Sequence, residues 1–110
     1  MNSTSFLAAE LNRLLQLERD IHASGPVAES GWAIDTSGRF ARACPPRVNG
    51  KAIGKTIAIG QISGSEHRDW QRKIQRRNAL QEIARRGIIL QAMIDSPIWR
   101  PEGSARVRID

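Results

Sequence analysis

The sequence predicts a small α+β protein with an N-terminal amphipathic helix, a three-stranded antiparallel β-meander, a basic second helix and a C-terminal arm. Three observations predict this order. Leucines recur at three- and four-residue spacing near the start, alternating segments with turn residues follow, and a basic amphipathic stretch comes next. The 110 residues suit one compact domain, assigned to 1–95, followed by an extended arm over 96–110.

Residues 1–23 are expected to form the first helix, because apolar side chains gather on one side of it. The chain-breaking pair Gly25-Pro26 marks its end. The apolar stripe favours packing in the core, with dimerisation as the alternative use. The stripe consists of Leu7, Leu11, Leu14, Leu15, Leu17 and Ile21.

Residues 31–63 are expected to form β-structure. A strand at 32–34, a turn at 35–38 and a returning strand at 39–44 predict a hairpin. The prolines at 45 and 46 stop the second strand, and Asn49-Gly50 offers a further turn.

The third strand is expected over 52–62. One of its faces carries isoleucines, and the other carries only small residues between Ala52 and Gly60. Small residues allow a helix or a ligand backbone to approach closely, and of these two we expect a helix to pack on that second face.

Residues 65–87 are expected to form the second helix. Ser63 or Ser65 is the candidate N-cap and Gly87 the candidate C-cap. Periodicity leaves residues 88–94 open between a strand and a short helix. In the arm, Trp99 stands between two prolines, and we expect it to dock on the domain or on a partner.

The net charge of +6 is unevenly distributed along the chain. Residues 1–30 carry −2 and residues 88–110 carry zero, so the whole excess lies between 31 and 87. Basic residues in a compact region favour binding to phosphates. The excess of Arg over Lys, 14 against 3, supports phosphate contact only weakly, since a GC-rich genome also favours Arg.

Within the second helix, Arg68, Arg72 and Arg76 recur every four residues and form a column about 12 Å long. Such a column can span adjacent phosphates of a nucleic-acid strand. The sequence therefore predicts a non-enzymatic nucleic-acid-binding protein, for DNA or RNA, with no cofactor. The predicted phosphate contacts are Arg68, Arg72, Lys73 and Arg76 from the helix, and Arg39, Arg42, Lys51 and Lys55 from the sheet.

The order of helix, hairpin, third strand and helix is similar to that of the double-stranded-RNA-binding domain, and also resembles integrase arm-binding modules. In the RNA-binding family a K-K-x-A-K signature contacts phosphates. Residues 72–76 carry basic side chains at its three basic places, but Gln75 stands where alanine belongs. The resemblance is one of element order and not of motif, so the chain is not assigned to the family.

Two other functions remain open. The first is a protein-interaction module, an inhibitor or adaptor such as a phage-encoded one, that binds an acidic protein or nucleoprotein partner through Trp99, Trp70 or the leucine stripe. The second is a small ribonuclease that uses Glu66, His67 and Arg68, although consecutive helix residues point in different directions.

Other chemistries find little support. Residues 50–56 resemble a P-loop, but Asn49 stands where its first glycine belongs. One Cys and two His at distant positions predict no metal site, and a Cys44–His67 nucleophile pair has no local support. The single Cys and the lack of a signal-like or membrane-length apolar run lead us to expect a cytoplasmic protein with no membrane contact.

Overall fold

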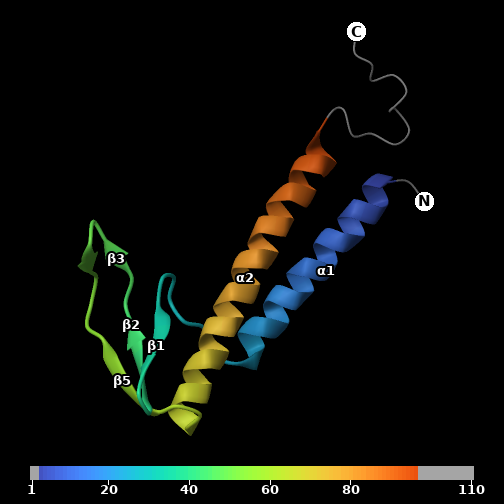
Figure 1. The fold of residues 1–110 in the computed structure, drawn as a ribbon. Coiled ribbons are helices and arrows are strands. Elements are labelled where there is room, and N and C mark those ends of the chain that lie inside the picture. The colour runs from blue at the N-terminus through green and yellow to red at the C-terminus, as the bar shows by residue number, and fades with distance from the viewer. Residues whose placement is uncertain (1–2, 97–110) are drawn as a thin grey trace. The chain divides into compact units, whose positions relative to one another are not determined.

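The computed structural model describes residues 3–96, and it has the α+β class that the sequence predicts. Trp99 and the rest of the expected arm beyond Ser96 lie outside the described residues. Figure 1 shows the elements in chain order. They are α1 (Ser3–Ser24), β1 (Ala33–Ser37), β2 (Phe40–Cys44), β3 (Arg47–Val48), β4 (Lys51–Ala52), β5 (Ile57–Gln61) and α2 (Ser65–Asp95).

The chain forms two compact units. Met1–Ala23 and Leu80–Asp110 make up the first, here called the helical unit. Ser24–Ala79 make up the second, here called the sheet unit. Helix α2 contributes to both, its first half to the sheet unit and its second half to the helical unit.

In the helical unit, α1 spans Ser3–Ser24, which agrees with the predicted helix except that residues 1–2 lie outside the described residues and the helix ends one residue later. Leu7 and Leu14 are buried, so part of the leucine stripe forms the core of this unit. Leu15 and Leu17 remain 41% and 37% exposed. The apolar stripe is therefore wider than the core that the unit buries.

Helix α2 begins at Ser65 as predicted, but it is longer than expected and its predicted C-terminal boundary is wrong. Gly87 lies inside the helix, and the undecided residues 88–94 continue it to Asp95. A glycine inside a helix costs only about 1 kcal/mol, and the first proline after it is Pro97, so nothing local stops the helix earlier. At the other end Gly64 accepts the first helical hydrogen bond, from the Arg68 N–H at 3.0 Å, in place of the expected serine caps.

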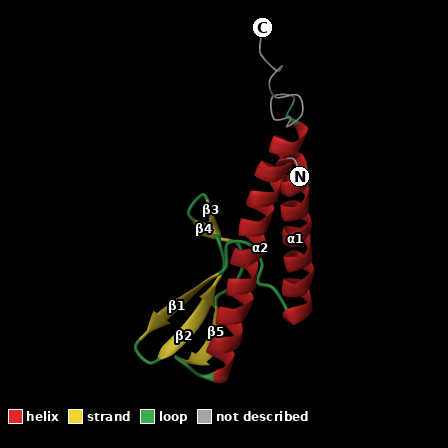
Figure 2. Ribbon diagram, turned by 90° about the vertical axis from the view of Figure 1, so that its right-hand side faces the viewer, coloured by secondary structure: helices red, strands yellow, loops and turns green. Residues whose placement is uncertain are grey.

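The sheet has the strand order β1-β2-β5 and is antiparallel throughout, which confirms the meander. Its first turn lies at residues 38–39, later than expected, because β1 continues to Ser37. The first half of α2 lies alongside the sheet in both ribbon views (Figure 2). The core between them holds Ala41, Ala43 and Ile59, with Trp32, Ile34 and Trp70 packed against it.

The expectation for the third strand is wrong in two respects. The small-residue face does not receive the helix: Ala58 and Gly60 are exposed, whereas Ile59 is 1% exposed in the core. The register of β5 also shifts between its pairs with Phe40 and Arg42. Gly60 has φ +88° at this bulge, a conformation that favours glycine.

The first residues assigned to that strand instead form a separate hairpin. Strands β3 and β4 pair through Arg47 with Ala52 and Val48 with Lys51. The Asn49-Gly50 turn has positive φ at both residues, 54° and 80°, as a two-residue hairpin turn requires. Neither helix of residues 3–96 has an apolar stretch long enough to cross a membrane.

Candidate nucleic-acid interface

The sheet unit carries the whole net charge of the protein. Residues 24–79 contain ten basic and four acidic residues, a net charge of +6. The remaining residues contain seven of each sign and are neutral. The basic character that the sequence indicates therefore coincides with one compact unit.

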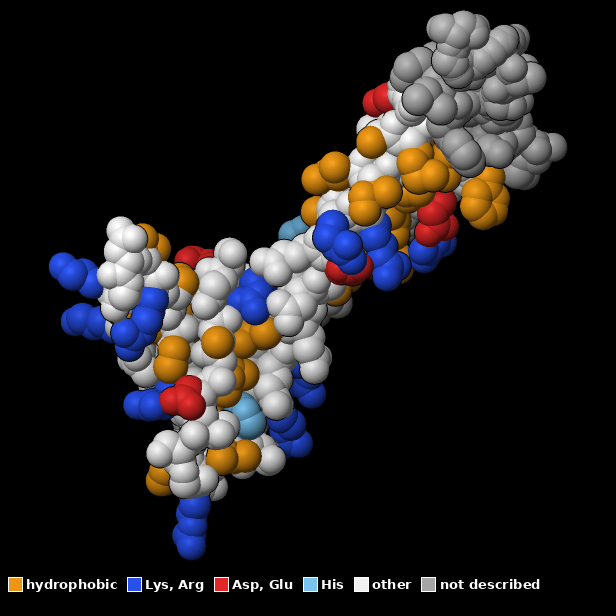
Figure 3. Space-filling model, turned by 45° about the horizontal axis from the view of Figure 1, so that its top comes forward, with side chains coloured by type: hydrophobic (Ala, Val, Ile, Leu, Met, Phe, Trp, Pro, Cys, Tyr) orange, Lys and Arg blue, Asp and Glu red, His pale blue; other side chains and the backbone are white. Residues whose placement is uncertain are grey.

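The β3–β4 hairpin and its flanks expose three basic side chains. Arg47 lies on β3, Lys51 on β4 and Lys55 in the loop before β5, and all three are exposed. Figure 3 shows Lys and Arg side chains gathered on this end of the sheet unit. Arg47 donates to the Gly50 carbonyl of its own hairpin, at 3.2 Å. No ion pair to Lys51 or Lys55 occurs within residues 3–96.

The outward face of the sheet, opposite the core, carries two further predicted residues. In β2, Ala41 and Ala43 point into the core, so Phe40 and Arg42 point outward, and both are exposed. Arg42 donates to the Asp35 carboxylate across the β1–β2 ladder at 2.5 Å. This hydrogen bond raises the pKa of Arg42, which stays a cation. Arg39 is exposed in the turn next to Phe40.

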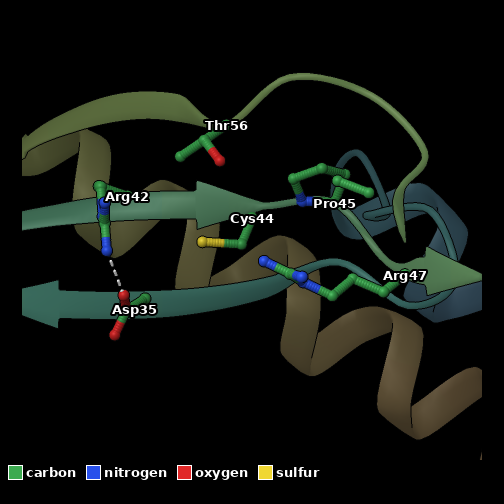
Figure 4. A pocket seen from close by; sticks show the side chains of 7 residues that line it. Asp35, Arg42, Cys44, Pro45, Arg47 and Thr56 are labelled. Carbon is green, nitrogen blue, oxygen red and sulfur yellow. Dashed lines mark hydrogen bonds and ion pairs between the residues drawn. The ribbon is translucent and has the colours of Figure 1, made fainter. Parts of the chain in front are cut away.

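A cleft of about 310 Å³ lies where this face meets the hairpin. Figure 4 shows Arg42 and Arg47 on its lining, with Cys44 between them. Two guanidinium groups face one carboxylate, Asp35, so the cleft is suited to an anion. Its residues are Asp35, Arg42, Cys44, Pro45, Arg47, Ala52 and Thr56.

The predicted basic column of α2 divides into an outward and an inward part. Arg68 and Arg72 stand two residues on either side of Trp70, which packs on the core. Because two helical residues differ by about 200°, both arginines point away from the sheet. They are exposed, and Arg72 pairs with Asp69 at 3.2 Å.

Lys73 and Arg76 are half-buried and make contacts inside the sheet unit. The Lys73 Nζ lies 4.9 Å from the centre of the Trp70 ring, a cation–π contact. Arg76 donates to the Ser24 hydroxyl, the Ser24 carbonyl and the Pro26 carbonyl, at 3.0–3.1 Å. Gly25 makes this possible, since a Cβ there would lie 2.6 Å from the Arg76 Cζ.

The structure therefore does not bring the eight predicted residues together on one surface. Arg72, Lys73 and Arg76 line a cleft of about 300 Å³ against residues 24–26. Arg42 lies on the outward face of the sheet, while the first half of α2 covers the opposite face. The outward face and the hairpin hold the more available cations, because those of the helix cleft are already engaged.

Sequence reasoning missed two residues of the outward region. Arg47 is counted in the predicted charge of residues 31–87 but is not among the predicted phosphate contacts. Its position beside the Asn49-Gly50 turn could have indicated that it lies near the tip of a hairpin. Phe40 is missed because alternation alone does not reveal which face of β2 is covered.

The three residues of the ribonuclease hypothesis, Glu66, His67 and Arg68, differ in burial. His67 is 6% exposed, and its Nδ1 accepts a 2.8 Å hydrogen bond from the Ser63 N–H at the start of α2. Glu66 and Arg68 beside it are exposed. Cys44 is a half-buried free thiol on the outward side of β2. Residues 3–96 contain no group of three His, Cys, Asp or Glu side chains that would hold a metal ion.

The chain matches no protein-family model, no curated protein and no solved structure. The similarity in element order to RNA- and DNA-binding modules is accompanied by no such match. A function for the outward face is therefore inferred from the residues of that face alone.

Proposed function

We propose that this protein binds nucleic acid without catalysing a reaction, through the outward sheet face and the β3–β4 hairpin of the sheet unit. The observation that carries the proposal is the confinement of the +6 charge to this unit, with exposed cations at both ends of one sheet face. Those cations are Arg39, Arg47, Lys51 and Lys55.

The physical basis is counterion release. Each phosphate that a Lys or Arg neutralises releases condensed cations from the nucleic acid, so affinity falls as salt rises. The free cations of the hairpin make this exchange without breaking an internal ion pair. Arg42 and Arg72 are already paired with carboxylates, and a phosphate must compete with those partners.

The test is a salt titration of binding to fluorescently labelled DNA and RNA oligonucleotides, measured by anisotropy. The variant Lys51→Gln/Lys55→Gln removes two hairpin charges. The matched control, Arg13→Gln/Arg19→Gln, removes two exposed charges from α1 in the helical unit.

We expect the hairpin variant to bind about tenfold more weakly at low salt. Its slope of log affinity against log salt should be shallower by about 1.5, since two phosphate contacts are lost. The α1 variant should retain affinity within about twofold. Absence of binding by the wild type at low salt would refute the proposal, and equal losses in both variants would reduce it to general charge attraction.

A second candidate function is protein contact through the helical unit. In that unit Ile88 is 72% exposed and Ile89 is 50% exposed on the second half of α2. Exposed apolar side chains in sequence are typical of contact surfaces. Sedimentation equilibrium of the wild type and of Ile88→Asp, in nuclease-treated samples, tests self-association as the simplest form of this contact.

A further inference from the structure

The outward face of the sheet presents an aromatic ring to solvent. Phe40 is 58% exposed, although it belongs to the central strand of a three-stranded sheet. Exposing a phenyl ring to water is unfavourable. The neighbouring residues Ala41 and Ala43 of β2 point to the opposite face and are buried in the core. The ring is placed where a ligand can reach it.

The neighbours of Phe40 leave the ring accessible and add hydrogen-bonding groups. Its cross-strand partners are Ser37 on β1 and Gln61 on β5, and both are exposed. The Ser37 hydroxyl and the Gln61 amide flank the Phe40 ring. They can donate hydrogen bonds to, and accept them from, the edge of a planar ligand stacked on that ring. Phe40 remains 58% exposed between these two partners, so its ring stays accessible.

Two arginines lie close to Phe40 in the sequence and on the sheet. Arg39 precedes Phe40 in the turn, and Arg42 follows on the same face with its charge balanced by Asp35. Strand β2 covers about 13 Å from Phe40 to Cys44, and the hairpin cations begin beyond its end. The middle of the face is therefore nearly neutral, with positive charge at each end.

We propose that this face binds single-stranded nucleic acid, with an unpaired base stacked on Phe40 and the phosphates directed to Arg39 and the hairpin cations. The inference rests on the proposed function and specifies its ligand. A duplex offers its phosphates but keeps its base faces stacked inside, so it cannot use the Phe40 ring.

The experiment compares Phe40→Ala with Phe6→Ala, which removes an equally exposed ring, 63% against 58%, from α1. Binding is measured to a labelled single strand and to the duplex of the same sequence. Phe40→Leu keeps an apolar side chain without a π face, and Phe40→Trp keeps a larger one. Circular dichroism verifies that each variant is folded.

We expect Phe40→Ala and Phe40→Leu to weaken single-strand binding roughly tenfold and to leave duplex binding within twofold. Phe40→Trp and Phe6→Ala should bind the single strand as the wild type does. Single-strand affinity that is unchanged in Phe40→Ala, or equal losses for strand and duplex, would overturn the inference. If Lys51→Gln/Lys55→Gln still weakens binding in that case, the proposed function stands without the stacked base.

Discussion

The guanidinium of Arg77 donates a 2.6 Å hydrogen bond to the backbone carbonyl of Trp32, 45 residues earlier in the chain. The same Nη1 donates to the Glu29 carbonyl at 3.1 Å. Two carbonyls of the segment before β1 are thus bound to one side chain of α2. Arg77 borders the apolar stripe of the helix in the sequence, and the structure gives it a structural role that charge counting does not reveal.

Replacing Arg77 with Ala should destabilise the sheet unit by about 2 kcal/mol, because two backbone carbonyls lose a charged donor in a half-buried setting. Arg77→Lys should recover less than half of this, since an ammonium lacks the planar fork. Urea unfolding followed by Trp fluorescence reports on this unit through Trp32 and Trp70. Arg85→Ala, which removes an exposed ion pair of the same helix, should cost less than about 1 kcal/mol, and an equal cost would contradict the assignment.

The inner face of β2 is fully covered by the core of the sheet unit. Ala43 is 0% exposed in the core beside Trp32 and Trp70. Ala43→Val should therefore lower the free energy of unfolding by about 1–3 kcal/mol, through overpacking. Ala58→Val, on the exposed side of the neighbouring β5, should change it by less than about 0.5 kcal/mol. A neutral Ala43→Val in the same urea experiment would show that the sheet and α2 do not pack as closely as described.

The sequence predicts the elements of this fold better than it predicts their packing. Gly25-Pro26 ends α1 and Asn49-Gly50 makes a hairpin, because these residues act locally through their backbone conformations. The side of the third strand that receives the helix was predicted wrongly. A single bulge at Gly60 and a core of two alanines opposite Ile59 decide that face, and both depend on strand pairing that no local pattern contains.

The candidate site shows the same limit. All of the excess charge could be placed between residues 31 and 87 from the sequence, and the sheet unit contains it. The helical spacing of Arg72 and Arg76 is as predicted, but spacing does not reveal that Arg76 bonds to residues 24–26. Hydrogen bonds across about fifty residues depend on the tertiary fold, so the sequence could not reveal that Arg76 also binds residues 24–26.

Acid should weaken the second half of α2 through Glu82. Hydrogen bonds from Arg85, and then from Arg86, hold the pKa of this carboxyl below its usual value. A carboxylate with a lowered folded-state pKa stabilises the fold above its ordinary pKa, and this contribution is lost as the pH falls through the folded-state value. Glu82→Gln should therefore lower the Tm slightly at pH 7, and this difference should shrink as the pH falls through the lowered folded-state pKa of Glu82. A Tm difference that does not shrink as the pH is lowered would assign the effect to packing instead of charge.

Replacing Gly87 with Ala should stabilise the helical unit. Gly87 lies in the interior of α2, where Ala is more favourable than Gly by about 1 kcal/mol. A Cβ at this position would meet the Leu11 Cδ1 at 3.7 Å, an ordinary van der Waals contact that adds apolar packing between α1 and α2. If Gly87 instead ended the helix as a left-handed C-cap, Ala would lower stability by about 1–2 kcal/mol. Thermal unfolding followed at 222 nm separates these opposite signs: a higher Tm for Gly87→Ala supports the continuous helix to Asp95, and a lower one supports a helix that stops at residue 87.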